Sequence, residues 1–181
     1  MQQDVESEAG PGRPPIWLAL LCLIPGALYF HAEAPLLPSL VLFLNLWVLS
    51  VYDWMSYRLP NLLTLSLFLT GLLFALVSHV GRLEVYFIGA VVGGLFFPTL
   101  NLFYKGVRGR DGVGLGDAKL LAAIGMWLGW PALPIVLLVA SLAGLLYALV
   151  GVGLKRGVSM TSRIPFGPFL CLGGWVAWLL F

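Results

Sequence analysis

Long apolar stretches, separated by short polar turns, occupy almost the whole 181-residue chain. A helix needs about 20 mostly apolar residues to cross a bilayer, with a range near 17–25. The pattern predicts seven such segments, at residues 16–30, 36–52, 62–79, 85–104, 118–130, 132–154 and 164–181. The first and fifth are short, and six crossings result if the first only dips into the membrane. We therefore expect an all-α integral membrane protein, a polytopic bundle of about seven transmembrane helices.

Composition strengthens this prediction. Hydrophobic residues make up 60% of the chain and charged residues only 10%, with a mean hydropathy of +0.98, whereas soluble domains carry about 25% charge. Residues 1–15 are polar and proline-containing, which predicts a disordered tail rather than a signal peptide, because a basic n-region is missing. Residues 16–181 are expected to form a single membrane domain. Cys22 and Cys171 lie in apolar segments, and no Cys-x-x-Cys pair indicates a zinc or redox site.

Basic residues indicate the orientation of the chain. If the N-terminus is cytoplasmic and there are seven crossings, nine of the ten Lys and Arg residues face the cytoplasm, as the positive-inside rule requires. Those nine are Arg13, Arg58, Lys105, Arg108, Arg110, Lys119, Lys155, Arg156 and Arg163. Arg82 is the exception. The basic cluster is also suited to contact anionic lipid headgroups.

Two of the eight acidic residues stand at the ends of apolar segments. Asp53 follows the segment that ends at residue 52, and Asp117 immediately precedes the segment that begins at residue 118. A carboxylate costs roughly 3 kcal/mol at the centre of a membrane helix and less near an interface, so a retained acid is a functional candidate. The orientation above places both aspartates at the cytoplasmic face. We therefore predict that Asp53 and Asp117 form a pair.

Asp117 also has a purely structural interpretation. Aspartate is favoured at a helix N-cap, where its oxygen accepts a free backbone N–H, and a helix is expected from residue 118. The alternating Gly112, Gly114 and Gly116 instead indicate the close approach of another backbone, which a simple cap does not need. The two roles are compatible.

Asp53 lies near the C-terminal end of its predicted helix, where the helix dipole disfavours an anion. A structural ion pair with Arg58 or Lys119 is the alternative to a functional role. Downstream, Pro60 blocks helix continuation and Asn61 suits the N-cap of the next helix.

The remaining polar residues suggest no second site. Asp111 lies beside Arg110 and is expected to be a solvated loop residue, and Asn45 and Asn101 are expected to form hydrogen bonds between helices. His31 and His79 fall at the opposite face from the aspartates. The sequence shows no Ser/His/Asp set, no His-rich metal site, no Walker loop and no nucleic-acid-binding signature, so neither a metal nor a cofactor is expected.

These residues resemble the type IV prepilin peptidases, a family of GxGD-type intramembrane aspartic proteases. Asp53 with Arg58-Leu59-Pro60-Asn61 is similar to the first family motif, and Gly114-Leu115-Gly116-Asp117-Ala118-Lys119-Leu120 is similar to the second. Pro165-Phe166-Gly167-Pro168 resembles the stretch that opens the last helix of the family. The resemblance covers residues 41–181.

The resemblance implies that Asp53 and Asp117 are catalytic. It also implies that Gly114, Gly116, Lys119, Arg58, Pro60, Asn61, Pro165 and Gly167 support the geometry of the site. The implied reaction is removal of the leader peptide from prepilins or type II secretion pseudopilins, at the cytoplasmic face of the bacterial inner membrane. One carboxyl would stay protonated while the other activates water, because two adjacent carboxylates do not ionise together easily.

The chain departs from the bifunctional members of the family, whose cytoplasmic segment carries two Cys-x-x-Cys pairs associated with N-methylation. Those cysteines are missing here, so we expect a peptidase without methyltransferase activity. A presenilin-like protease that cuts other substrates is one alternative. A small transporter or channel is another, although its ion-binding acids would be expected near the bilayer midplane.

Overall fold

The computed structural model describes residues 23–31, 34–108, 114–153 and 165–181. Across these ranges the chain is helical and contains no strand, which confirms the all-α prediction. The elements are η1 (Ile24–His31), α2 (Leu36–Ser56), α3 (Asn61–Ser78), η2 (Val80–Arg82), α4 (Leu83–Arg108), α5 (Leu115–Leu128), η3 (Trp130–Ala132), α6 (Leu133–Gly153) and α7 (Gly167–Leu180). The predicted tail at residues 1–15, Cys22, and the loop that contains Arg110, Asp111 and Gly112 lie outside the described ranges.

Four stretches of the described chain are long and apolar enough to cross a membrane: Leu36–Ser56, Asn61–Ser78, Val80–Lys105 and Trp130–Val150. They establish a multi-pass membrane protein. Helices α5 and α7 have 14 residues each, which corresponds to about 21 Å at 1.5 Å per residue. The hydrocarbon core is about 30 Å thick, so these two helices are shorter than a full crossing.

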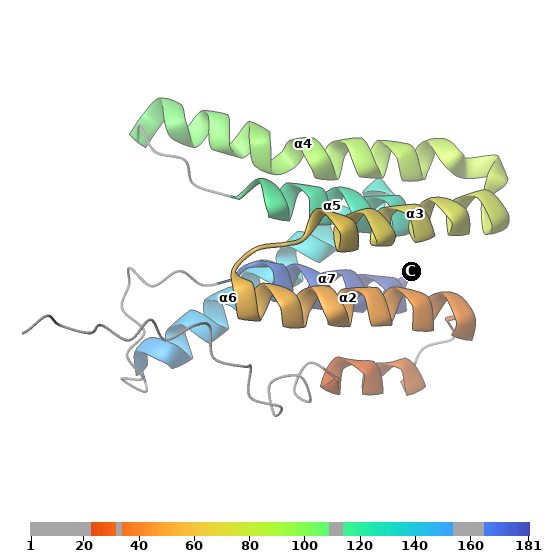
Figure 1. Cartoon of the computed structure of the whole chain (residues 1–181), viewed down its shortest axis with the longest axis horizontal. Helices are drawn as coiled ribbons and strands as arrows, with labels where there is room; N and C mark the ends of the chain where they lie inside the picture. The colour runs from red at the N-terminus through yellow and green to blue at the C-terminus, as the bar shows by residue number, and fades with distance from the viewer. Residues whose placement is uncertain (1–22, 32–33, 109–113, 154–164) are drawn as a thin grey trace, which may run out of the picture.

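Helix α5 is the centre of the bundle. It packs against α4, α3 and α7, and these lie around it in Figure 1, where α2 lies in front of α7. Most of its side chains are buried: Ala118, Leu120, Leu121, Ala123, Ile124, Gly125, Met126 and Trp127. A helix that is apolar on most sides belongs in the interior of a bundle, which explains why the shortest predicted crossing is largely enclosed.

The contact between α4 and α5 is a direct approach of two backbones. A Cβ atom on Gly89 would overlap the carbonyl oxygen of Gly125, and a Cβ atom on Gly125 would overlap that of Gly89. One turn further along α4, a Cβ atom on Gly93 would lie 2.5 Å from the carbonyl oxygen of Leu121. Small residues permit such close packing of membrane helices, where van der Waals contact replaces the hydrophobic effect as the driving force.

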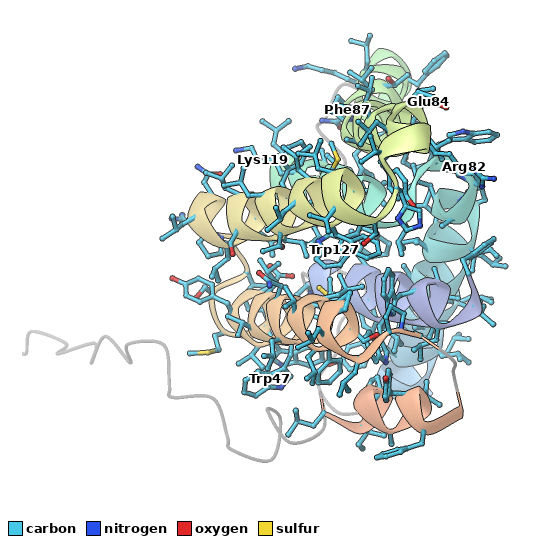
Figure 2. All side chains as sticks on the ribbon, turned by 90° about the vertical axis from the view of Figure 1, so that its right-hand side faces the viewer. Trp47, Arg82, Glu84, Phe87, Lys119 and Trp127 are labelled. Atoms are coloured by element: carbon cyan, nitrogen blue, oxygen red, sulfur yellow. The ribbon has the colours of Figure 1, made fainter. Side chains whose placement is uncertain are left out.

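Trp127 fills the interior on the other side of α5 and is only 2% exposed. Figure 2 shows it between the ribbons of the bundle, while Phe87 points outward from α4. Its indole N–H donates to the carbonyl of Leu67 over 2.8 Å, and its ring stacks on Phe74 at 5.2 Å between centroids. Gly71 makes room for it, since a Cβ atom there would lie 2.5 Å from the ring. One side chain thus joins α5 to α3 by packing and by a hydrogen bond.

Hydrogen bonds between side chains connect α2 to its neighbours. Ser66 on α3 donates to the amide oxygen of Asn45 over 3.2 Å, which confirms the interhelical role predicted for Asn45. Trp178 on α7 donates to the hydroxyl of Ser39 over 2.9 Å. Both bonds satisfy polar groups that would otherwise face hydrocarbon.

The glycine contact generates a stability prediction. Gly125→Ala should lower the thermal stability of the purified protein in detergent, because overpacking typically costs about 1–3 kcal/mol and the obstacle here is backbone. The matched control is Gly144→Ala on α6, whose added Cβ would have no neighbour nearer than 3.6 Å. Equal melting temperatures for the two variants would contradict the backbone contact between α4 and α5.

Candidate active site

Asp53 lies on the last turn of α2, which continues past the apolar segment to Ser56. Tyr57 then adopts the left-handed conformation, with φ 51°, and its backbone N–H bonds to the Asp53 carbonyl over 2.8 Å. The Asp53 side chain is buried, with 5% exposure. A carboxylate is therefore enclosed one turn before the end of a membrane helix.

The turn after α2 leads directly into α3. Pro60 is extended, with ψ 133°, and takes the N-cap position, so Asn61 is the first residue of the helix and its predicted N-cap role is wrong. The Asn61 side chain is instead used between helices: its amide oxygen accepts a hydrogen bond from the ammonium group of Lys119 over 2.7 Å. This bond joins the start of α3 to α5, two residues after Asp117.

Asp117 is the third residue of α5, whose N-cap is Gly114. The predicted N-cap role of Asp117 is therefore wrong, although the side chain still lies in the first helical turn. It is half-buried, and its carboxyl group lies within range of an electrostatic interaction with that of Asp53. The structure thus brings together two aspartates that are 64 residues apart in the sequence.

Gly114 and Gly116 do not have the role that their spacing suggests, whereas Gly112 lies outside the described residues. A Cβ atom on Gly116 would meet the side chain of Leu59 at 3.4 Å, an ordinary contact, and one on Gly114 would meet nothing nearer than 4.0 Å. No second backbone approaches either residue within the described part of the chain. The contact between Gly116 and Leu59 nevertheless places the turn after Asp53 against the start of α5.

The third motif reaches the site through α7. Pro165 is buried, and the backbone N–H of Gly167 donates to Oδ2 of Asp53 over 3.1 Å. A Cβ atom on Gly167 would lie 2.5 Å from that oxygen, so glycine is required for the approach. Three segments that are distant in sequence therefore meet around Asp53.

The structural ion pair considered for Asp53 is not formed. Lys119 donates to Asn61, and Arg58 is exposed in the turn between α2 and α3. Among the residues that the structure describes, no basic side chain forms a salt bridge with Asp53 or Asp117. A purely structural role in an ion pair therefore does not explain the burial of Asp53.

Charged residues divide between the two ends of the bundle. The end of α2, the start of α5 and the end of α4 all lie toward the left of Figure 1, so Arg58, Lys105, Arg108 and Lys119 belong to the same end of the bundle as the aspartates. Arg82 and Glu84 lie together at the other end, which faces the viewer in Figure 2. This division matches the predicted asymmetry for every basic residue in the described ranges.

His79 lies at the end of the bundle away from the aspartates, as predicted. Its ring packs between Phe74 and Tyr86, and its buried Nδ1 atom has no hydrogen-bond partner in the part of the chain that the structure describes. A hollow of about 420 Å³ opens there, lined in part by these three residues and by Trp127 and Trp178. Among the described residues, no group of three His, Cys, Asp or Glu side chains is placed to hold a metal ion.

Two nearby carboxyl groups in a mostly apolar surround can share one proton, since the charge on each disfavours ionisation of the other. Such a pair supplies a general base and a general acid together and needs no covalent intermediate. The geometry is therefore suited to the addition of water to a carbonyl group.

Comparison with known proteins agrees with the motifs. Residues 40–149 match the model of the type IV leader peptidase family. The chain is 44% identical over 143 residues to the "Prepilin leader peptidase/N-methyltransferase" of Aeromonas salmonicida strain A449, covering 79% of this chain and 49% of that protein. It is 40% identical over 166 residues to the protein of the same name from Burkholderia pseudomallei strain 1026b, covering 91% of this chain and 53% of that protein.

The chain therefore spans about half the length of the curated relatives that it matches. No solved structure matches it. The first two motifs, with Asp53 and Asp117, lie inside the range matched by the family model, and the third lies C-terminal to it. On the family match and the identity to these relatives, the chain belongs to the type IV leader peptidase family.

Proposed function

We propose that this protein is a membrane-embedded aspartic endopeptidase that removes the leader peptide from type IV prepilins or type II secretion pseudopilins. The observation that carries the proposal is the pairing of Asp53 and Asp117 at one end of an apolar bundle. Family membership supports peptidase activity, and the names of the relatives support a prepilin substrate.

The proposed reaction uses one ionised and one protonated carboxyl group. The ionised group takes a proton from a water molecule, which attacks the carbonyl carbon of the scissile peptide bond. The protonated group donates a hydrogen bond to the carbonyl oxygen and then gives its proton to the leaving amine. The products are a free leader carboxylate and a new N-terminal amine, and one water is consumed.

The position of the pair suits a substrate whose leader lies in the cytoplasm, directly before a hydrophobic helix. The aspartates and most of the described basic residues share one end of the bundle, and the positive-inside rule assigns that end to the cytoplasm. The proposed location is the bacterial inner membrane, with a cytoplasmic N-terminus. A transporter is less well supported, since its acids would be expected near the midplane. A presenilin-like protease uses the same chemistry but is not the family that the chain matches.

Methylation of the new N-terminus is not part of the proposal. The relatives are named as both peptidases and N-methyltransferases, but the sequence of this chain contains no Cys-x-x-Cys pair and no glycine-rich loop after a strand. We therefore assign only the proteolytic step to these residues.

The first prediction from the proposed function concerns the aspartates. Asp53→Asn and Asp117→Asn should each lower the rate of leader cleavage at least about a hundredfold, because general acid–base catalysis contributes roughly 10²–10⁴-fold. Both variants should still insert and accumulate in membranes. Asp111→Asn is the matched control and should keep most of the activity. Substantial cleavage by either pair variant would remove that residue from the catalytic pair.

The second prediction concerns orientation. In a variant without native cysteines, single cysteines near Arg108 and Lys155 should be labelled from the cytoplasm, and a cysteine near Glu84 should be labelled from outside. The reason is the distribution of basic residues. Labelling near Glu84 from the cytoplasm would reverse the proposed topology and place the aspartates at the wrong face.

The third prediction separates the two activities of the relatives. Purified protein, a prepilin and labelled S-adenosylmethionine should give a cleaved product with an unmodified N-terminal amine, as measured by mass spectrometry. A methylated product formed by this chain alone would show that the methyl-transfer site lies within these residues.

A further inference from the structure

The first turn of α7 supplies a backbone donor to Asp53. Pro168 has no N–H group, and the N–H groups of Phe169 and Leu170 both bond to the carbonyl of Phe166 over 3.1 Å. The Gly167 N–H instead donates to Oδ2 of Asp53. The free N–H groups of a helix start carry its positive partial charge, and here that charge is directed at one oxygen of one aspartate.

The two aspartates differ in this contact. Asp117 also lies in the first turn of a helix, whose field favours an anion, but among the described residues no hydrogen bond ends on its carboxyl group. Asp53 is the more enclosed of the two, and a hydrogen bond is stronger where water is excluded. A donor to an ionised carboxylate is also roughly twice as strong as one to a neutral acceptor.

The other charged residues of the neighbouring helices do not offset this difference in hydrogen bonding between Asp53 and Asp117. Lys119 on α5 bonds to Asn61 on α3, and Arg58 is exposed. Helix α7 contains no charged residue, and neither does α6. Among the described residues of α2, α5, α6 and α7, the charged group that interacts with Asp53 is Asp117, and the backbone donor to Asp53 is Gly167.

We propose that Gly167 is a positioning residue that holds Asp53 as the ionised member of the pair and leaves the shared proton on Asp117. The inference rests on the proposed function and assigns the roles within it. Oδ2 of Asp53 is occupied by the Gly167 N–H, so Oδ1 takes the proton from water. Asp117 donates its proton to the leaving amine, and transfer of the new proton from Asp53 to Asp117 restores the starting state.

Aromatic contacts fix the turn that carries this donor. Phe166 packs against Phe97 of α4 at 6.1 Å, and Phe169 packs against Tyr147 of α6 at 5.7 Å between ring centroids. Since aromatic pairs add about 0.5–1.5 kcal/mol beyond their burial, the turn is held from two neighbouring helices. The position of the Gly167 N–H is thus set by the bundle and not by α7 alone.

The direct test is the protonation state of each aspartate, measured by NMR on protein labelled with ¹³C at aspartate carboxyls. The chain has only four aspartates (Asp4, Asp53, Asp111 and Asp117), so each signal can be assigned by an Asn substitution. At neutral pH the Asp53 signal should be that of a carboxylate and the Asp117 signal that of a carboxylic acid. A protonated Asp53, two carboxylates, or two equally averaged signals would overturn the proposal.

Replacing the Gly167 amide by an ester removes the donor without adding bulk. This variant should move the Asp53 signal toward the carboxylic acid and lower the turnover number about tenfold to a hundredfold, with little change in KM. The matched control is an ester at Phe169, which removes an N–H of the same turn that bonds to Phe166; its Asp53 signal should not move. Equal Asp53 signals in the two ester variants would overturn the positioning role.

The carboxyl NMR signals report the protonation of each aspartate whether or not the protein cleaves a prepilin. If the chain fails to cut prepilins but shows the unequal signals, the proposed function fails and the role of Gly167 stands. If it cuts prepilins and the signals are reversed, the role fails and the function stands.

Discussion

The structure depends on holding two carboxyl groups together at one end of an apolar bundle. Charged groups in hydrocarbon are costly, and a like charge nearby adds to that cost. The cost of burying the Asp53 carboxylate is offset by a hydrogen bond from the backbone N–H of Gly167, at the start of α7. The last turn of α2, which carries Asp53, is closed by Tyr57 in the left-handed conformation. The helices are therefore arranged so that α2, α5 and α7 all end or begin at the same place.

The packing of the bundle holds the helix ends that carry the two aspartates in place. Helix α5 brings Asp117 to the site because it is enclosed by α3, α4 and α7. The close approach of Gly89 and Gly125 holds α4 against it, and Trp127 holds α3. The bond from Lys119 to Asn61 then joins the two motifs at the level of the aspartates. Substitutions far from the aspartates are expected to alter the site through these contacts.

Much of this could be predicted from the sequence. Hydrophobic length identifies the spanning helices, and the scarcity of acids identifies Asp53 and Asp117, because both signals are local. The ends of the helices were less predictable from hydropathy. The apolar segment ends at residue 52, but α2 continues to Ser56. Asn61 and Asp117 suit an N-cap by residue type, but Pro60 and Gly114 occupy those positions.

Contacts between distant segments were not predictable from local pattern. Gly114 and Gly116 were expected to admit another backbone, whereas the close backbone contact of the described chain lies at Gly89 and Gly125. The bond from Gly167 to Asp53 links residues 114 positions apart, and only the motif containing Gly167 gave a signal for it. Such contacts depend on how whole helices pack, which no single segment specifies.

The most direct measurement of the central claim is chemical cross-linking of the two aspartate positions in native membranes. Cys22 and Cys171 would be replaced, Asp53→Cys and Asp117→Cys introduced, and a protease site inserted between α4 and α5. A short thiol-reactive cross-linker should hold the two fragments together after cleavage, while the pair Glu84→Cys and Asp117→Cys, from opposite ends of the bundle, should separate. Separation of the Asp53 and Asp117 pair, with both cysteines shown to be reactive, would contradict the paired site.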